Sequence, residues 1–235
     1  MRNGGNAPLP VGLALAGGGV SGAFFEFGAV AALEECLPAW RASRSSMVVG
    51  TSCGAIVAAI LGFGIDAHEP LRAVQAKGHP LRLRTRDVYR FPWGRHARGL
   101  GRAAALLPKA LTGRGGDKGG FLDTLFDLHR EMPSGVFSND GLGGLLQRVA
   151  AHAGRRDAFE DLLMPVRITA TNLNHAGRAV YGAGYELGAP VSGAVRASTC
   201  IPYYMHPVTL LDQDLIDGQI VDPIHLDLAV TPDVR

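Results

Sequence analysis

The sequence predicts an α/β fold with a mainly parallel central sheet and helices on both faces, carrying one basic insertion. Two successive segments predict it. Residues 11–16 form an apolar run, followed by glycines at 17–19 and by a helical stretch over residues 21–37. Residues 47–49 form a second apolar run, followed by a tight glycine turn and an apolar helix over residues 53–63. The repeated order of strand, glycine turn and helix is typical of a parallel α/β sheet.

Later segments continue an α/β pattern within what we expect to be a single domain spanning residues 1–235. The length suits one domain, and 47% hydrophobic residues suffice for a large core. The expected elements are an amphipathic helix over 142–151, a strand over 166–171, a short helix over 192–200, and a hairpin over 208–216 that ends at Asp217-Gly218.

A lid-like insertion is expected at about 66–120, where prolines and aromatic residues interrupt this rhythm. Within it, residues 71–118 hold twelve basic and two acidic residues, a net charge of +10, although the whole chain carries only +2. Helical patterns are also expected over 102–111 and 121–130. Such a charge block indicates an anionic partner, which we expect to be an anionic membrane surface. No nucleic-acid motif accompanies the charges, so no nucleic-acid partner is expected.

Cysteine content indicates a cytoplasmic protein, and the basic segment indicates that it associates peripherally with a membrane. Cys36, Cys53 and Cys200 are odd in number and form no CxxC pair, which favours a reducing compartment and argues against a zinc site. No metal or other cofactor is expected. The first apolar run is too short for a signal peptide. The uncharged stretch 45–65 could span a membrane by length, but its glycines favour a strand, a turn and a buried helix.

The glycine loop permits two interpretations. Gly17-Gly18-Gly19-Val20-Ser21-Gly22 fits the GxGxxG pattern between a strand and a helix. Backbone N–H groups that converge at a helix N-terminus favour an anion, either a dinucleotide pyrophosphate or the oxyanion of an acyl intermediate. A dinucleotide fold usually places an acid at the end of the second strand, and none is present at 50–54. An NADP-type site and a glycine turn without a ligand remain open.

A nucleophile elbow is predicted where the second strand meets its helix. Gly50-Thr51-Ser52-Cys53-Gly54 reads GxSxG, a motif that exposes a serine hydroxyl on a sharp strand-to-helix turn. An equally simple alternative is that Ser52 caps the helix by accepting hydrogen bonds from its first N–H groups.

Four motifs taken together resemble the patatin-like phospholipase family. They are the glycine loop, the GxSxG turn, the segment Ala197-Ser198-Thr199-Cys200-Ile201-Pro202, and the segment Leu215-Ile216-Asp217-Gly218. The resemblance extends from Leu13 to Asp227.

This resemblance implies a serine esterase that cleaves the acyl esters of lipids, of phospholipase A or lysophospholipase type. By matching position, Ser52 would be the nucleophile and Asp217 the base of a Ser–Asp dyad. The backbone N–H groups of Gly17, Gly18 and Gly19 would form the oxyanion hole.

Two positions depart from the family pattern and keep an alternative open. Ser21 stands where the family usually has Arg or Lys, and Gln219 stands where it usually has Gly or Ala. These departures favour a catalytically weak lipid-binding module of the same fold.

A second alternative concerns the base itself. In a histidine triad, His206 or His225 would be the base. Asp212 or Asp214 could also replace Asp217.

Overall fold

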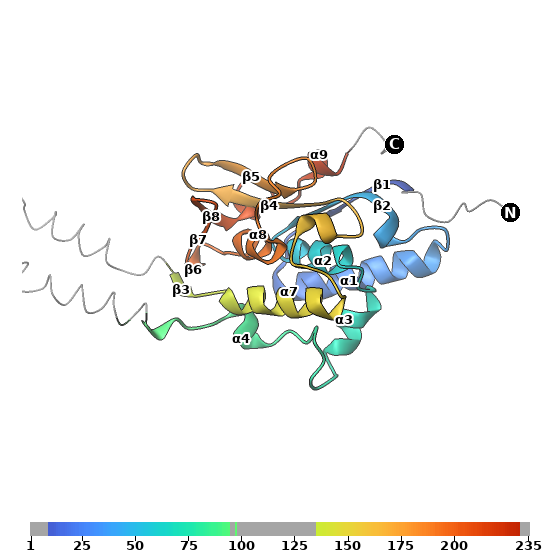
Figure 1. Ribbon diagram of the computed structural model, residues 1–235, viewed down its shortest axis with the longest axis horizontal. Helices are drawn as coiled ribbons and strands as arrows, with labels where there is room; N and C mark the ends of the chain where they lie inside the picture. Colours follow the sequence, from blue (N-terminus) through green and yellow to red (C-terminus); the bar gives the residue numbers. More distant parts are fainter. Residues whose placement is uncertain (1–8, 95–96, 98–134, 231–235) are drawn as a thin grey trace, which may run out of the picture.

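The computed structural model describes residues 9–94, 97 and 135–230. Its first half follows the order expected from the sequence (Figure 1): β1 (Leu9–Leu15), α1 (Gly19–Cys36), β2 (Ser45–Thr51) and α2 (Cys53–Gly62). Both strands are short and largely apolar; β1 passes into α1 through Gly17 and Gly18, and Gly50 and Gly54 flank the turn from β2 to α2. The two strand–turn–helix units predicted from the sequence are therefore confirmed, with boundaries shifted by one or two residues.

The central sheet has six strands and confirms the α/β class. Its order is β1-β2-β4-β8-β7, and β5 also pairs with β4. β1, β2 and β4 run parallel, whereas β5, β8 and β7 join by antiparallel pairing. The later strands are β4 (Val166–Asn172), β5 (Gly177–Gly182), β7 (Val208–Leu210) and β8 (Gln213–Asp217).

One edge of β4 is shared by two strands that meet end to end. β5 pairs with β4 along residues 167–172 and so occupies one edge throughout. On the other edge, β2 pairs up to Thr169 and β8 pairs from Ala170 onward. Because β2 runs parallel to β4 and β8 runs antiparallel, their carboxyl ends converge at this junction. The residue that follows β2 and the last residue of β8 are thereby brought together.

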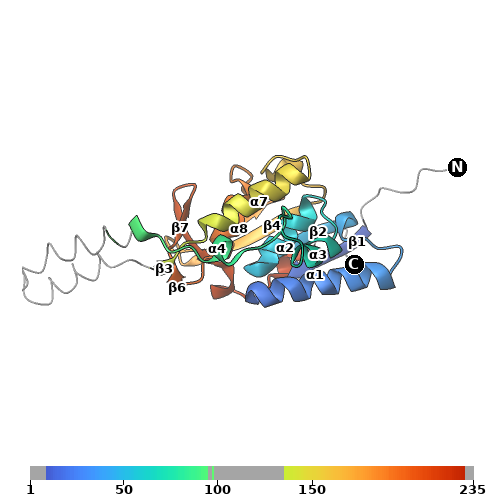
Figure 2. The same cartoon turned by 90° about the horizontal axis from the view of Figure 1, so that it is seen from below.

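Helices cover both faces of the sheet. α1 and α7 (Asp140–His152) lie on either side of α2, and α8 (Val191–Ser198) packs beside them (Figure 2). α9 (Leu226–Ala229) covers the opposite face of β1 and β2 (Figure 1). Alternate residues of β2 point to opposite faces of the sheet. Val48 joins the main core, whereas Met47 and Val49 pack against α9.

The described part of the expected insertion contains two short helices, α3 (His68–Ala73) and α4 (Thr85–Val88). The helices predicted over 102–111 and 121–130 lie outside the described residues. A second, two-stranded sheet joins β3 (Gly135–Phe137) to β6 (Tyr203–Met205). The 3-10 turns are η1 (Ala42–Arg44), η2 (Phe159–Asp161) and η3 (Gly218–Ile220). Within the described ranges, no helix has the length and apolar character needed to cross a membrane.

We expect Gly54→Ala to destabilise the fold by about 1–3 kcal/mol or more, the usual cost of overpacking. A Cβ at Gly54 would lie 2.5 Å from the Leu15 carbonyl oxygen, which belongs to a backbone that cannot easily move. Gly28→Ala is the matched control, since among the described residues no atom outside the neighbouring backbone of α1 lies within 4 Å of its Cβ position. That control should gain about 0.5–1 kcal/mol. Urea unfolding measures both, and equal stability of the two variants would contradict the close packing of β1 on α2.

Candidate active site

Ser52 occupies a sharp turn between β2 and α2. Its backbone φ is 54° and its ψ is −121°, a region that non-glycine residues rarely adopt and that costs conformational energy. Two neighbouring glycines permit the turn: a Cβ at Gly50 would lie 2.5 Å from the Gly54 carbonyl oxygen. In the described part of the chain, the Ser52 side chain makes no helix-capping bond. The hydroxyl is therefore directed elsewhere.

The Ser52 hydroxyl contacts a carboxylate. Its Oγ donates to Asp217 Oδ2 at 2.7 Å, and both residues are buried, with exposures of 4% and 3%. Ser52 follows β2 and Asp217 ends β8, so the contact lies at the junction on the β4 edge. A carboxylate at this distance can accept the serine proton.

Burial and hydrogen bonding act on the Asp217 carboxyl in opposite directions. Burial raises the pKa of Asp217, whereas hydrogen bonds from the Gln219 backbone N–H, at 2.9 Å, and from Ser52 lower it, leaving the pKa above its ordinary value. Gly218 lets the chain turn here, because a Cβ on it would lie 2.6 Å from the Thr169 carbonyl oxygen. The Asp-Gly pair is thus required by close approach to β4.

Ser198 positions the elbow, a role that the sequence did not reveal. The Ser52 backbone N–H donates to Ser198 Oγ at 2.8 Å, and Ser198 is fully buried at the end of α8. The bond links residues 146 positions apart. The Ala197-Ser198 segment was identified by resemblance alone, and its contact with the elbow explains why a small hydroxyl side chain stands there.

The glycine loop lies beside the elbow and is tied to it. The Gly54 N–H donates to the Ala16 carbonyl at 3.1 Å. Gly19 has φ 64° and contributes to the lining of the cavity described below. The end of the Gln219 side chain covers Gly17, since a Cβ there would lie 2.0–2.2 Å from its carboxamide atoms. Ser21 is exposed, with its Oγ 3.5 Å from the Gly18 carbonyl oxygen.

Cys53 fills the space behind this loop. Its Sγ lies 3.6 Å from the Ala16 carbonyl oxygen, and a Cβ on Gly22 would lie 3.0 Å from the sulfur. Burial, followed by the nearby Glu26 and Asp217 carboxyls, raises the pKa of Cys53 to about 12. The thiol therefore stays protonated at neutral pH, which makes it a packing residue rather than a nucleophile.

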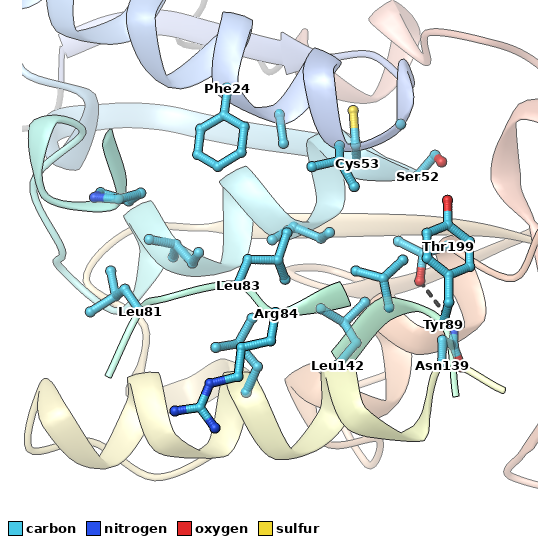
Figure 3. A pocket seen from close by; sticks show the side chains of 18 of the residues that line it. Phe24, Ser52, Cys53, Leu81, Leu83, Arg84, Tyr89, Asn139, Leu142 and Thr199 are labelled. Atoms are coloured by element: carbon cyan, nitrogen blue, oxygen red, sulfur yellow. Dashed lines mark hydrogen bonds between the residues drawn. The ribbon is translucent and has the colours of Figure 1, made fainter. Parts of the chain in front are cut away.

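An apolar cavity of about 380 Å³ opens from Ser52 between α1, α2 and α7. Figure 3 shows Ser52 near Tyr89, Thr199 and Asn139, with Phe24 and Leu81 farther along the cavity. Asn139 Nδ2 donates to Thr199 Oγ1 at 3.1 Å and to the Arg196 carbonyl at 2.7 Å, which fixes that end of the wall. Residues 81–84 and 88–89 line the cavity, so the described part of the expected insertion forms one wall.

The alternative acid and base candidates lie in other environments. His225 is buried, and its Nδ1 lies 3.2 Å from an Arg178 guanidinium nitrogen; burial and then Arg178 lower the pKa of His225. The backbone carbonyl of His206 accepts a bond from the Cys200 thiol at 2.7 Å. Asp212 has φ 59° at the turn of the β7–β8 hairpin, and Asp214 accepts a bond from Thr209.

A buried serine on a strand-to-helix elbow, bonded to a carboxylate beside an apolar cavity, is an arrangement suited to acyl transfer. The sequence model of the patatin-like phospholipase family matches residues 13–230, so the chain belongs to this family of lipid acyl hydrolases.

A solved structure was also found for comparison. VipD from Legionella pneumophila aligns over 97% of this chain and 48% of its own, with 16% identity and a TM-score of 0.46. The chain therefore spans about half the length of VipD. A comparison with curated proteins found no match.

We expect Ser198→Ala to lower the free energy of unfolding by about 1–3 kcal/mol, because the buried Ser52 N–H loses its acceptor. Ser21→Ala is the control, since Ser21 is exposed and its contact is long. Chemical denaturation measures both variants. An unchanged stability in Ser198→Ala would show that the Ser52 N–H does not depend on this bond.

Proposed function

We propose that this protein is a lipid acyl hydrolase of phospholipase A or lysophospholipase type that uses Ser52 and Asp217 as a catalytic dyad. The observation that supports the proposal is the 2.7 Å bond from Ser52 Oγ to Asp217 Oδ2 at one end of an apolar cavity. Membership of the patatin-like phospholipase family supports the lipid substrate.

The reaction proceeds through an acyl-enzyme. Asp217 takes the proton of Ser52 while the serine oxygen attacks the ester carbonyl. Backbone N–H groups of Gly17, Gly18 and Gly19 stabilise the oxyanion of the tetrahedral intermediate. Asp217 then gives its proton to the departing alcohol, leaving an acyl-serine. Asp217 next deprotonates a water molecule, which attacks the acyl-serine; as the intermediate collapses, the fatty acid leaves and Asp217 returns the proton to the Ser52 oxygen.

The buried position of Asp217 suits this role. An ordinary aspartate, with a pKa of about 3.9, is a weak proton acceptor at neutral pH. Burial raises the pKa of Asp217 and so increases its affinity for the serine proton. The remaining bond from the Gln219 N–H holds the carboxylate in place while Oδ2 faces Ser52.

The cavity suits an acyl chain. Its lining is largely aliphatic and aromatic, and Ile56 and Ile60 of α2 contribute to it beyond Ser52. Eight helical residues separate Ser52 from Ile60, which corresponds to about 12 Å along the α2 axis. An acyl chain whose ester lies at Ser52 would extend along α2 away from the elbow.

The basic segment at residues 71–118 would attach the enzyme to an anionic membrane surface. Of its described residues, Arg72, Lys77, Arg84 and Arg90 are exposed, so their charges face outward. Each basic residue near an anionic bilayer contributes about 1 kcal/mol, an attraction that falls with salt.

One observation favours a second candidate, a lipid-binding module with weak catalysis. The Gln219 side chain lies against Gly17, within the loop that would hold the oxyanion. A carboxamide there competes for the loop's N–H groups unless it moves when substrate binds. The activity of wild-type protein on a soluble ester separates this candidate from the hydrolase.

We expect Ser52→Ala to abolish hydrolysis of a short-chain nitrophenyl ester, because a missing nucleophile usually costs several orders of magnitude. The variant should keep its fold, since only the hydroxyl is lost. A fluorophosphonate should label wild-type protein at Ser52, as shown by peptide mass spectrometry, and should not label Ser52→Ala. Ser21→Ala serves as control and should react normally. Residual activity above a few per cent in Ser52→Ala would exclude it as the nucleophile.

We expect Asp217→Asn to abolish hydrolysis and to increase stability at neutral pH. The folded protein raises the pKa of Asp217, so ionising it costs stability as pH rises above about 3.9, the unfolded value. Asparagine avoids that cost, and the stability difference should vanish at lower pH. Wild-type activity should fall as acid protonates Asp217, with a midpoint above 3.9.

Substitutions at the other candidate residues provide the controls for Asp217→Asn. Asp212→Asn, in the same hairpin, should retain activity and a normal pH profile. Complete loss in His206→Ala or His225→Ala, with folding intact by circular dichroism, would favour a histidine triad instead.

A further inference from the structure

The second sheet, formed by β3 and β6, lies at the Ser52 end of the cavity. The two strands pair in parallel, with Phe137 opposite Met205. Just past β3, Ser138 exchanges two backbone hydrogen bonds with Arg90, of 2.9 and 2.7 Å. Three distant stretches of the chain therefore combine into one small sheet with two faces.

The inner face of this sheet belongs to the cavity wall. The rings of Tyr89 and Phe91 meet the Phe137 ring edge to face, with centroids 5.8 and 6.5 Å apart. Tyr89 and Met205 line the cavity, and Figure 3 shows Tyr89 close to Thr199 at the Ser52 end. Whatever lies against the outer face is therefore one sheet thickness from the cavity.

The outer face carries apolar and basic side chains that the described protein leaves exposed. Because side chains alternate along a strand, Val136 and Tyr204 lie side by side on the face opposite Phe137 and Met205. They are 45% and 59% exposed. Arg90, between the inward-facing Tyr89 and Phe91, is exposed as well.

Tyr203, the first residue of β6, adjoins Tyr204 and has a strained backbone. Its φ is 67°, a region that costs conformational energy for a side chain as large as tyrosine. The side chain recovers little of that cost within the protein, because Tyr203 is 88% exposed. The ring is therefore available for contact with a partner.

We propose that Val136, Tyr203, Tyr204 and Arg90, together called the tyrosine face, form the surface that docks the enzyme onto an anionic phospholipid bilayer. Tyrosine favours the boundary between headgroups and acyl chains, since its ring is apolar and its hydroxyl is polar. Arg90 supplies a guanidinium for lipid phosphate. The proposal rests on the proposed function, because it places the Ser52 end of the cavity at the membrane.

The composition of the face favours a bilayer over a protein partner. Its basic group lies in the segment with a charge of +10, which complements an anionic surface. Val136 and Tyr204 lie across the small sheet from Met205, which lines the cavity that would receive the lipid chain. A bilayer docked here would lie one sheet thickness from the cavity wall.

Tyr203→Gly and Tyr204→Ala test the docking surface in the full-length protein. We expect the double variant to bind vesicles of phosphatidylcholine and phosphatidylglycerol about tenfold more weakly than wild type, since binding strength follows the apolar area inserted. Glycine suits a positive φ, so Tyr203→Gly should not destabilise the fold. Arg90→Glu should weaken binding to these vesicles at low salt and have less effect at high salt. Vesicle co-sedimentation measures all of these.

Tyr185→Ala is the matched control. Tyr185 is 48% exposed, and its ring lies under Arg167, whose guanidinium also bonds the Leu228 carbonyl of α9 on the opposite face of the sheet. This control should bind vesicles normally. Equal vesicle binding by wild type and the double variant would overturn the proposal. A second result would also overturn the proposal: light scattering that shows a change from dimer to monomer in the double variant while vesicle binding is retained. The face would then join two copies of the protein.

A soluble nitrophenyl ester separates docking from catalysis. The tyrosine variants should hydrolyse it at the wild-type rate and lose activity only on vesicle phospholipid. Wild-type protein that binds vesicles through these tyrosines but hydrolyses neither substrate would support docking and refute the proposed function. Normal hydrolysis of vesicle phospholipid by the double variant would refute docking alone.

Discussion

The candidate site depends on the sharing of one edge of β4 by two strands of opposite direction. β2 ends its pairing at Thr169 and β8 ends its pairing at Ala170, so Ser52, which follows β2, and Asp217, which ends β8, meet at this junction. Hydrogen-bond register along β4 therefore fixes the distance between Ser52 and Asp217. A register slip of one residue would turn every side chain of the slipped strand to the other face and separate the pair.

The same junction concentrates features that are unfavourable on their own. Ser52 has a strained backbone, and Asp217 is a carboxyl removed from water. The surrounding structure holds both by short-range contacts: Ser198 accepts the Ser52 N–H, and Gln219 donates to Asp217. Glycines at 50, 54 and 218 allow backbones to approach where any side chain would collide. Strain and buried charge maintained in this way are usual at functional sites, because the rest of the fold offsets their cost.

Much of the fold was predictable because local signals agreed. Apolar runs ended by glycines located β1, α1, β2 and α2, and the Asp-Gly pair marked the end of β8. β5 was missed because the residues between Gly177 and Gly182 show only a weak alternation of apolar and polar side chains. The burial of this strand depends on its pairing with β4. The β3–β6 sheet was missed because each strand has three residues and pairs only with a distant partner. For the candidate site, motifs identified Ser52, Asp217 and the glycine loop. The roles of Ser198 and of the Gln219 side chain depend on long-range packing that no local pattern encodes.

The separation of Ser52 and Asp217 along the chain also bears on the order of assembly. The two residues lie 165 positions apart and meet only after β8 has paired with β4. Synthesis delivers the β1–α1 and β2–α2 units first and the β7–β8 hairpin later. A ribosome-bound chain thus presents the serine long before its aspartate exists. If Ser52 and Asp217 act as the proposed dyad, the nascent protein is inactive on lipid esters until β8 has paired with β4.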